Sequence, residues 1–180
     1  MAALIPTASA TGSGTMTLAG PSTNSNQTIT IPDATGTMMV SGNMPAFSAY
    51  RTTNQSVSGS TWTKVACQTE EFDTASAYDN ATNYRFTPQV AGYYQVCGQI
   101  LNDTSAPAAM RLIISIYKNG SAFKYGQDGA SNRSIVSALI YLNGSTDYVE
   151  LYGNTNSVNP LFQANTPADT YFQAVMVRGA

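Results

Sequence analysis

Hydrophobic and polar residues alternate along most of the chain after Pro45, which is the pattern of β-strands that bury one face. Residues 92–101 (GYYQVCGQIL) are the clearest case, because side chains on a strand point alternately to opposite sides. One side carries Tyr94, Val96, Gly98 and Ile100, and the other carries Tyr93, Gln95, Cys97 and Gln99. The first side suits a hydrophobic core. The second side mixes aromatic, amide and thiol groups, so it needs a partner that covers Tyr93.

The same alternation predicts eight strands and no long amphipathic helix. The strands are expected at residues 46–52, 62–68, 83–87, 92–101, 110–118, 134–143, 147–153 and 169–178. Many short strands separated by turn residues are typical of two sheets packed face to face. The sequence therefore predicts an all-β fold, a jelly-roll β-sandwich.

Glycine, asparagine and proline mark the turns between these strands. Asn119-Gly120 lies between two strand-like runs and is the strongest hairpin signal in the chain, and Asn143-Gly144 repeats it. Pro88 fixes its own φ and Gly92 can take a positive φ, so this pair predicts the turn that leads into the strand at Tyr93.

Residues 1–44 differ from the rest, because they are rich in threonine and contain no lysine or arginine. Short alternating runs occur at 15–18, 28–31 and 37–40. Their apolar positions, which we expect to mediate attachment to a partner, are Met16, Leu18, Ile29, Ile31, Met38 and Val40. Ribbons with so little apolar surface do not form a core alone. We therefore expect residues 1–44 to form an extended β arm for attachment or assembly, and residues 45–180 to form a jelly-roll knob.

The composition excludes several functional classes. Charged residues make up only 10% of the chain, against about 25% in an average globular protein. The net charge of -2 does not favour nucleic acid or an anionic membrane as a partner. Histidine is absent, which removes the commonest general base and metal ligand. We therefore expect no enzymatic activity, no cofactor, no nucleic acid partner and no membrane partner.

The amino terminus has no basic region followed by a long apolar run. We therefore expect no signal peptide and a protein that is made in a cytoplasm. Cys67 and Cys97 are the only cysteines, and without a secretory signal they predict no disulfide framework. Each is interpreted as a small apolar residue, and the alternative of a bridge between them stays open for the coordinates to decide.

Several segments resemble the C1q-type, tumour-necrosis-factor-like head domain. They are PAFSAYRTTNQSV from residue 45, EEFDTASAYDNATNYRFTPQVAGYYQV from 70, LIISIYKNGS from 112, YVELYG from 148 and TYFQAVMV from 170. The match as a whole extends over roughly residues 46–178. The resemblance implies a jelly roll that forms a tight homotrimer, with aromatic residues of the inner sheet around the threefold axis. The aromatic residues that we assign to this interface are Tyr93, Tyr94 and Tyr171.

The arm carries a second resemblance. The ribbon TITIPDATGTMMV, from residue 28, is similar to segments of bacteriophage structural proteins that precede a decorating or receptor-binding knob. The head also departs from secreted members of the family, because it has no collagen-like stem and little charge. Together these features imply a virion protein rather than a secreted ligand.

Two other groups of residues were weighed as binding sites. Glu71, Asp73 and Asp79 belong to an acidic cluster whose carboxylates suit Ca²⁺, but their spacing matches no EF-hand loop, so a solvated loop between strands is the favoured interpretation. Trp62 with Tyr50 or Tyr78 would suit a sugar-stacking platform. A place for Trp62 in the core is favoured, because it lies in an alternating strand.

Two functional hypotheses follow. The first is a homotrimeric capsid decoration, or cement, protein whose arm binds the major capsid protein or another virion protein and stabilises the head shell. The alternative is the knob of a short tail or head fibre that binds a receptor, such as a host surface glycan. Either protein would lie on the virion surface after assembly in the host bacterial cytoplasm.

Overall fold

The computed structural model describes residues 38–103, 110–164 and 166–180, together with positions 13, 15, 17, 22, 24 and 26. The chain divides into two compact units, Met1–Gly36 and Thr37–Ala180, and the second unit contains both β-sheets. The described residues form β-strands and one short 3-10 helix, Ser41–Asn43. None of them belongs to a helix that is long and apolar enough to cross a membrane.

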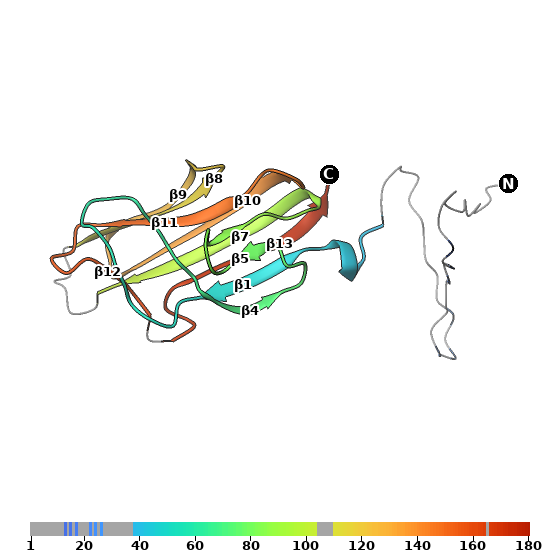
Figure 1. The fold of residues 1–180 in the computed structure, drawn as a ribbon, viewed down its shortest axis with the longest axis horizontal. Coiled ribbons are helices and arrows are strands. Elements are labelled where there is room, and N and C mark those ends of the chain that lie inside the picture. Colours follow the sequence, from blue (N-terminus) through green and yellow to red (C-terminus); the bar gives the residue numbers. More distant parts are fainter. Residues whose placement is uncertain are drawn as a thin grey trace. The chain divides into compact units, whose positions relative to one another are not determined.

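Two antiparallel sheets build the head (Figure 1). The first contains β1 (Ala46–Tyr50), β2 (Gln55–Ser56), β4 (Thr69–Asp73), β7 (Ala91–Asn102), β10 (Arg133–Asn143), β12 (Leu161–Gln163) and β13 (Tyr171–Gly179). The second contains β3 (Thr63–Lys64), β5 (Tyr78–Asp79), β6 (Arg85–Phe86), β8 (Arg111–Lys118), β9 (Ser121–Ala130) and β11 (Val149–Thr155). The predicted all-β jelly roll is confirmed.

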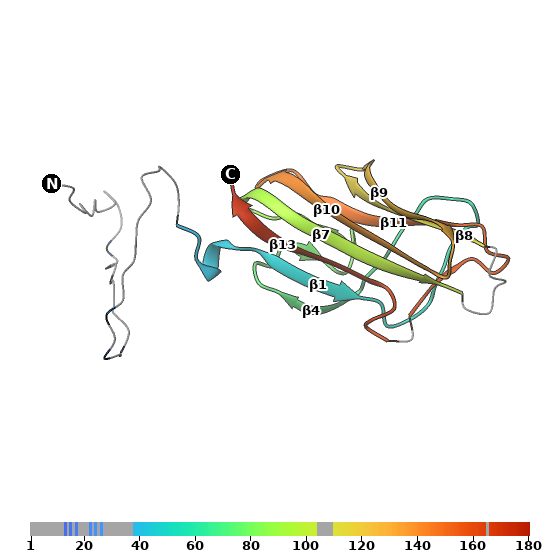
Figure 2. The ribbon, with the colours of Figure 1, turned by 180° about the vertical axis from the view of Figure 1, so that it is seen from behind.

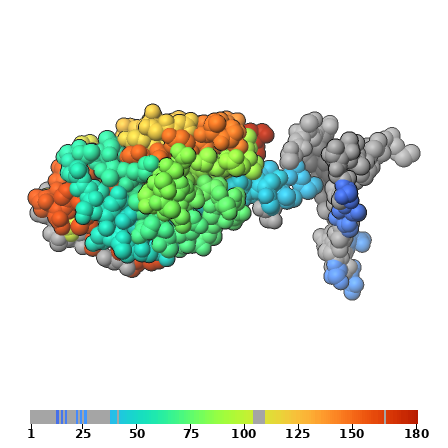
Figure 3. Space-filling model, viewed as in Figure 1, coloured from blue at the N-terminus to red at the C-terminus, as the bar shows by residue number. Residues whose placement is uncertain are grey.

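The long strand β7 organises the first sheet. Its residues pair with β10 from Ala91↔Asn143 to Leu101↔Arg133, and with β13 on its other side. β13 pairs in turn with β1, and β1 with β4. Figure 2 shows β4, β1, β13, β7 and β10 side by side in this order. On the opposite side of the head, the segment between β1 and β7, coloured teal to light green, covers much of the surface seen in Figure 3.

The hydrophobic core lies between the sheets and contains a cluster of aromatic rings. Phe47 on β1 is its hub, because its ring stacks on Tyr78 at 4.5 Å and on Phe86 at 4.6 Å, and meets the edge of Phe172 at 5.2 Å. Tyr94 joins the cluster through Phe86, with ring centroids 5.7 Å apart. Aromatic pairs of this kind add about 0.5–1.5 kcal/mol each beyond the burial of their area. The predicted core side of strand 92–101 therefore faces the other sheet.

The strand predicted at 62–68 is much shorter in the structure, where only Thr63–Lys64 pairs with β11. Side chains take the place of a neighbouring strand just beyond it. The backbone N–H of Ala66 donates to Gln55 Oε1 at 3.0 Å, and the carbonyl of Ala66 accepts a hydrogen bond from the Arg51 guanidinium. Because the N–H and the carbonyl of Ala66 already have hydrogen-bond partners, they do not need a neighbouring strand.

Five strands were not predicted: the short β2, β5 and β12, and the longer β4 and β9. β4 is rich in acidic residues, and the sequence interpretation placed it in a solvated loop; in the structure it pairs with β1. β9 contains no alternation to detect, because nearly all of its residues are exposed. It forms because the turn at Asn119-Gly120 folds it back onto β8. Both turn residues have positive φ, 53° and 78°, so the predicted hairpin is confirmed.

The second Asn-Gly pair does not form a hairpin, because β10 and β11 belong to different sheets. Asn143 Oδ1 instead accepts the N–H groups of Ser145, Thr146 and Asp147, which turns the chain from one sheet to the other. Gly144 has a φ of 71°, as a tight turn requires.

The reason for a glycine at position 92 also differs from the prediction. Gly92 is a residue of β7 and is not among the residues with positive φ. A Cβ placed there would lie 2.4 Å from the carbonyl oxygen of Arg178 and 2.4 Å from the end of Met176. Close approach of β13, rather than a special backbone angle, therefore requires this glycine.

Of the arm positions assigned to attachment, Met16, Leu18, Ile29 and Ile31 lie outside the described residues. Met38 and Val40 are exposed, at 76% and 52%, whereas Met39 between them packs against the core. Residues 38–40 form no strand, unlike the predicted run at 37–40.

Candidate functional site

The outer side of the β4-β1-β13-β7-β10 layer exposes an apolar surface, which we call the open face. Its exposed apolar residues are Phe72 (50%), Tyr93 (40%), Ile135 (50%), Leu139 (56%), Tyr141 (43%), Val175 (44%) and Val177 (52%). They are most of the large apolar side chains that the described residues expose. Such a concentration on one sheet marks an interaction surface.

Strand register places these side chains in rows across the sheet. Gln95 on β7 lies between Leu139 on β10 and Val175 on β13. In the adjacent row Tyr93 pairs with Tyr141, and their ring centroids are 5.5 Å apart. The register of β7 therefore makes one continuous apolar surface from residues that are far apart in the sequence.

The amide groups on the open face are already hydrogen bonded within the chain. Gln95 Nε2 donates to Ser137 Oγ at 2.7 Å, and Gln173 Nε2 donates to Cys97 Sγ at 3.2 Å. Gln99 Nε2 donates to two carbonyl oxygens of the loop before β13. Burying a polar group costs little when it keeps its hydrogen bonds. These amides therefore do not prevent the face from being buried.

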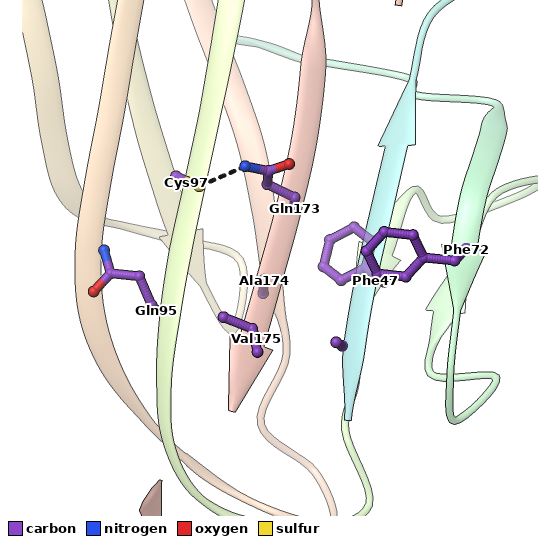
Figure 4. Close-up of a pocket in the computed structure, with 8 residues that line it drawn as sticks. Phe47, Phe72, Gln95, Cys97, Gln173, Ala174 and Val175 are labelled. Carbon is purple, nitrogen blue, oxygen red and sulfur yellow. Dashed lines mark hydrogen bonds between the residues drawn. The ribbon is translucent and has the colours of Figure 1, made fainter. Parts of the chain in front are cut away.

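A shallow hollow of about 260 Å³ lies on this face between β1, β13 and β7. Figure 4 shows Gln95 and Cys97 on β7, Val175 on β13 and Phe72 on β4 around it. Cys97 is its only thiol, and no carboxylate or amine lines it. The hollow suits an apolar side chain of a neighbouring molecule.

The three tyrosines assigned to the interface do not share one face. Tyr93 belongs to the open face, and Tyr171 lies on the same side and is partly exposed. Tyr94 is fully buried in the core, where its hydroxyl donates to the carbonyl of Val90 at 2.7 Å and burial raises its pKa to about 12. The assignment of Tyr94 to an interface is therefore wrong, because neighbouring residues on a strand point to opposite sides.

No family model matches the sequence, and no curated protein matches it. Solved structures do match. Murine APRIL aligns with a TM-score of 0.54 and 16% identity over 74% of this chain and 99% of its own. The Eiger TNF of S. frugiperda aligns with a TM-score of 0.51 and 13% identity over 76% of this chain and 93% of its own. This chain has the TNF-like jelly-roll fold. Identities this low show the fold alone.

In this TNF-like jelly roll all three calcium candidates accept hydrogen bonds from the chain, and Asp73 and Asp79 hold turns. Asp73 accepts the N–H groups of Ala75 and Tyr78, and Glu71 accepts the Ser48 hydroxyl at 2.6 Å. Among the described residues, no three acidic, cysteine or histidine side chains lie close enough together to hold a metal ion. Glu71, Asp73 and Asp79 are therefore not brought together as a cation site.

Asp79 holds the turn that leads into β6. Its carboxylate accepts the backbone N–H groups of Ala81, Thr82 and Asn83 at 2.9 to 3.1 Å, and Asn83 Nδ2 at 2.6 Å. The hydrogen bond from Thr82 is the largest of the influences that lower the pKa of Asp79 to about 2.

This lowered pKa predicts an acid-dependent contribution to stability. Because the folded pKa lies below the unfolded value, the carboxylate stabilises the fold above about pH 4 and loses this effect as the pH falls towards 2. Asp79→Ala should therefore lower Tm at pH 7, and the difference from wild type should shrink through this pH range. Thermal denaturation of both proteins at a series of pH values checks this. A difference that does not change with pH would contradict the assigned role.

Both cysteines of the TNF-like head are free. Cys67 is fully buried in the core, where burial raises its pKa to about 12, and Cys97 lies on the open face. They are on opposite sides of the first sheet, so the interpretation as separate small apolar residues is confirmed.

The platform of Trp62 with Tyr78 is wrong, because Tyr78 stacks on Phe47 inside the core. The platform with Tyr50 is wrong as well, because Tyr50 belongs to β1 of the first sheet, whereas the ring neighbours of Trp62 lie on the second. Trp62 itself is partly exposed and precedes β3, so its assignment to the core is also wrong. Its ring centroid lies 6.1 Å from that of Tyr117 and 5.7 Å from that of Tyr125. Sequence reasoning missed Tyr125 because β9 gave no strand signal. Tyr117 lies on the predicted strand β8, but the alternation of residues does not show which strands lie beside it.

Proposed function

We propose that this chain is a non-enzymatic protein that self-associates as a homotrimer through the open face. The observation that carries the proposal is the apolar surface around Leu139, Tyr93 and Val175, whose neighbouring amides already have their hydrogen bonds. An exposed surface of this kind is stable in water when a partner covers it. A closed cyclic trimer lets identical subunits cover one another without forming an open-ended filament. The resemblance to the C1q/TNF-like head domain supports the threefold arrangement.

We further propose that the trimer is a decoration protein of a bacteriophage capsid, bound by its arm to the major capsid protein. The similarity of the arm to phage structural segments supports this role. Alternating threonine and apolar residues suit the addition of a strand to the sheet of another protein, in which main-chain hydrogen bonds supply much of the affinity. Met38 and Val40, which lie where the arm joins the head, are exposed and available to such a partner.

Deleting residues 1–36 should separate attachment from assembly. Met39 packs against the core, and Asn43 Oδ1 accepts the Val40 N–H at 2.8 Å, so the truncation keeps these contacts. We expect the shortened protein to remain a folded trimer and to lose binding to capsids that lack the wild-type protein. Co-sedimentation with such capsids measures the binding. Attachment at wild-type strength would show that the arm is not the attachment element.

Copy number in purified virions distinguishes decoration from the second candidate, a receptor-binding knob of a short fibre. A decoration protein should approach one copy per shell protein in quantitative mass spectrometry. A few trimers per particle would instead place the protein on a fibre or vertex. That alternative is favoured by one feature of the head, the exposed aromatic residues around Trp62.

A further inference from the structure

Four aromatic side chains form a row across the outer side of the second sheet. Tyr152 on β11 stacks on Tyr117 on β8 with ring centroids 3.8 Å apart and an angle of 15° between the rings. Trp62 lies between Tyr117 and Tyr125 on β9, at 6.1 and 5.7 Å, with both tyrosine rings tilted by about 50° to the indole. We call these four residues the aromatic row.

The row is not needed to close the core. The core side of β8 and β11 is filled by Ile114, Ile116 and Leu151, all fully buried on the opposite side of the sheet. Beneath the row lies Ser115, which is paired in register with both Tyr152 and Tyr125. Ser115 is completely buried, and its hydroxyl donates to a backbone carbonyl at 3.0 Å. The rings therefore form a surface layer over Ser115, whose hydroxyl is already hydrogen bonded.

The charged residue opposite Tyr152 is paired with a carboxylate, so it does not select an ionic ligand. Lys64, which is opposite Tyr152 in register, binds Glu150 at 2.5 Å. Lys64 Nζ also donates to the carbonyl of Asn83 at 3.0 Å. The neutral pair and the net charge of -2 argue against phosphate-rich partners such as nucleic acid, which require unpaired lysine and arginine.

The size of the row also limits what can bind it. A whole aromatic side chain offers roughly 150–250 Å², and three of these four are partly covered by their neighbours. The row therefore presents far less than the roughly 800 Å² per partner of a standard protein interface. It also lies on the opposite side of the sandwich from the open face, so self-association through that face leaves it accessible.

We propose that the aromatic row binds a neutral saccharide. Sugar rings have apolar C–H faces that pack on aromatic rings, and their hydroxyls require donors and acceptors at the rim. Tyrosine and tryptophan supply both kinds of contact, because each combines an apolar ring with a polar group. Trp62 and Tyr125 provide the stacking surface. The polar groups come from Tyr117 and Tyr152 and from the Lys64–Glu150 pair, because Lys64 is opposite Tyr152 in register and Glu150 is opposite Tyr117. This binding requires only the folded head and does not depend on the proposed attachment to a capsid.

The chain contains a single tryptophan, so its fluorescence reports on this site alone. We would titrate the full-length protein with cellohexaose, maltohexaose and N-acetylchitohexaose, each to about 10 mM, and follow the Trp62 emission. At least one saccharide should change the emission in a saturable manner, with matching heat in isothermal titration calorimetry.

Two variants test whether stacking carries the binding. Tyr125 is 64% exposed, so Tyr125→Ala should leave the protein folded and weaken saccharide binding about tenfold, whereas Tyr125→Phe should retain most of it. Phe123→Ala is the matched control, because Phe123 is a 47% exposed aromatic residue of the same strand whose ring contacts none of the row. This control should bind as wild type does.

The absence of a response to all three saccharides would overturn the proposal. So would equal weakening by Tyr125→Ala and Phe123→Ala, or a response to the oligonucleotide dT6 in place of the saccharides. None of these results would bear on trimer formation or capsid attachment, which are measured separately.

Discussion

Replacing Leu139 with glutamate should convert the proposed homotrimer into 19.0-kDa monomers without unfolding the jelly roll. Leu139 lies on β10 at one side of the open face and is 56% exposed in the isolated chain, so the new carboxylate stays in water when the subunit is alone. In the trimer the same group would be buried without a partner. An unpaired buried charge costs roughly 3–5 kcal/mol, and a threefold assembly would contain three of them.

Light scattering coupled to size exclusion measures this change directly, because the trimer has three times the mass of the monomer. Circular dichroism of the same samples reports whether the sheets persist. Val158→Glu is the control, because Val158 is the most exposed valine of the described residues, at 79%, and lies in the loop between β11 and β12, away from the open face. If the trimer survives both Leu139→Glu and Val158→Glu, the open face is not the assembly surface.

The sequence predicted the fold where the alternation of residues was strong. Strand 92–101 became β7 with its two sides as assigned, and Asn119-Gly120 formed its hairpin because both residues accept a positive φ. The pattern failed where tertiary contacts decide the structure. Ala66 is held by the side chains of Arg51 and Gln55, which single-strand reasoning does not detect.

The candidate sites were predictable only in part for a related reason. Alternation on β7 indicated that the side carrying Tyr93 needs a cover, but it did not indicate which strands extend that side. The pairing of Gln95 with Leu139 and Val175 depends on the register of three strands that are distant in the sequence. The aromatic row depends likewise on β9, whose exposed residues follow no periodic pattern. Both the open face and the aromatic row are surfaces whose residues are brought together by the pairing of distant strands.

Tyr93 and Tyr94 should respond in opposite ways to truncation. Tyr94→Ala should lower the free energy of unfolding by about 3–5 kcal/mol, because it removes a fully buried ring that meets Phe86 and a hydroxyl bonded to the Val90 carbonyl. Tyr93→Ala should change the stability of the monomer by less than about 1 kcal/mol, since its ring is 40% exposed and its main contact is Tyr141.

Both variants should be made in the Leu139→Glu protein, so that unfolding is not coupled to dissociation. Urea denaturation then gives the two free energies under the same conditions. In the protein with the natural Leu139, Tyr93→Ala should instead raise the concentration at which trimers dissociate, as analytical ultracentrifugation measures. Equal losses of monomer stability from the two truncations would contradict the assignment of one tyrosine to the core and its neighbour to the assembly surface. The pair therefore tests, at adjacent positions of β7, how one strand serves folding with one side and association with the other.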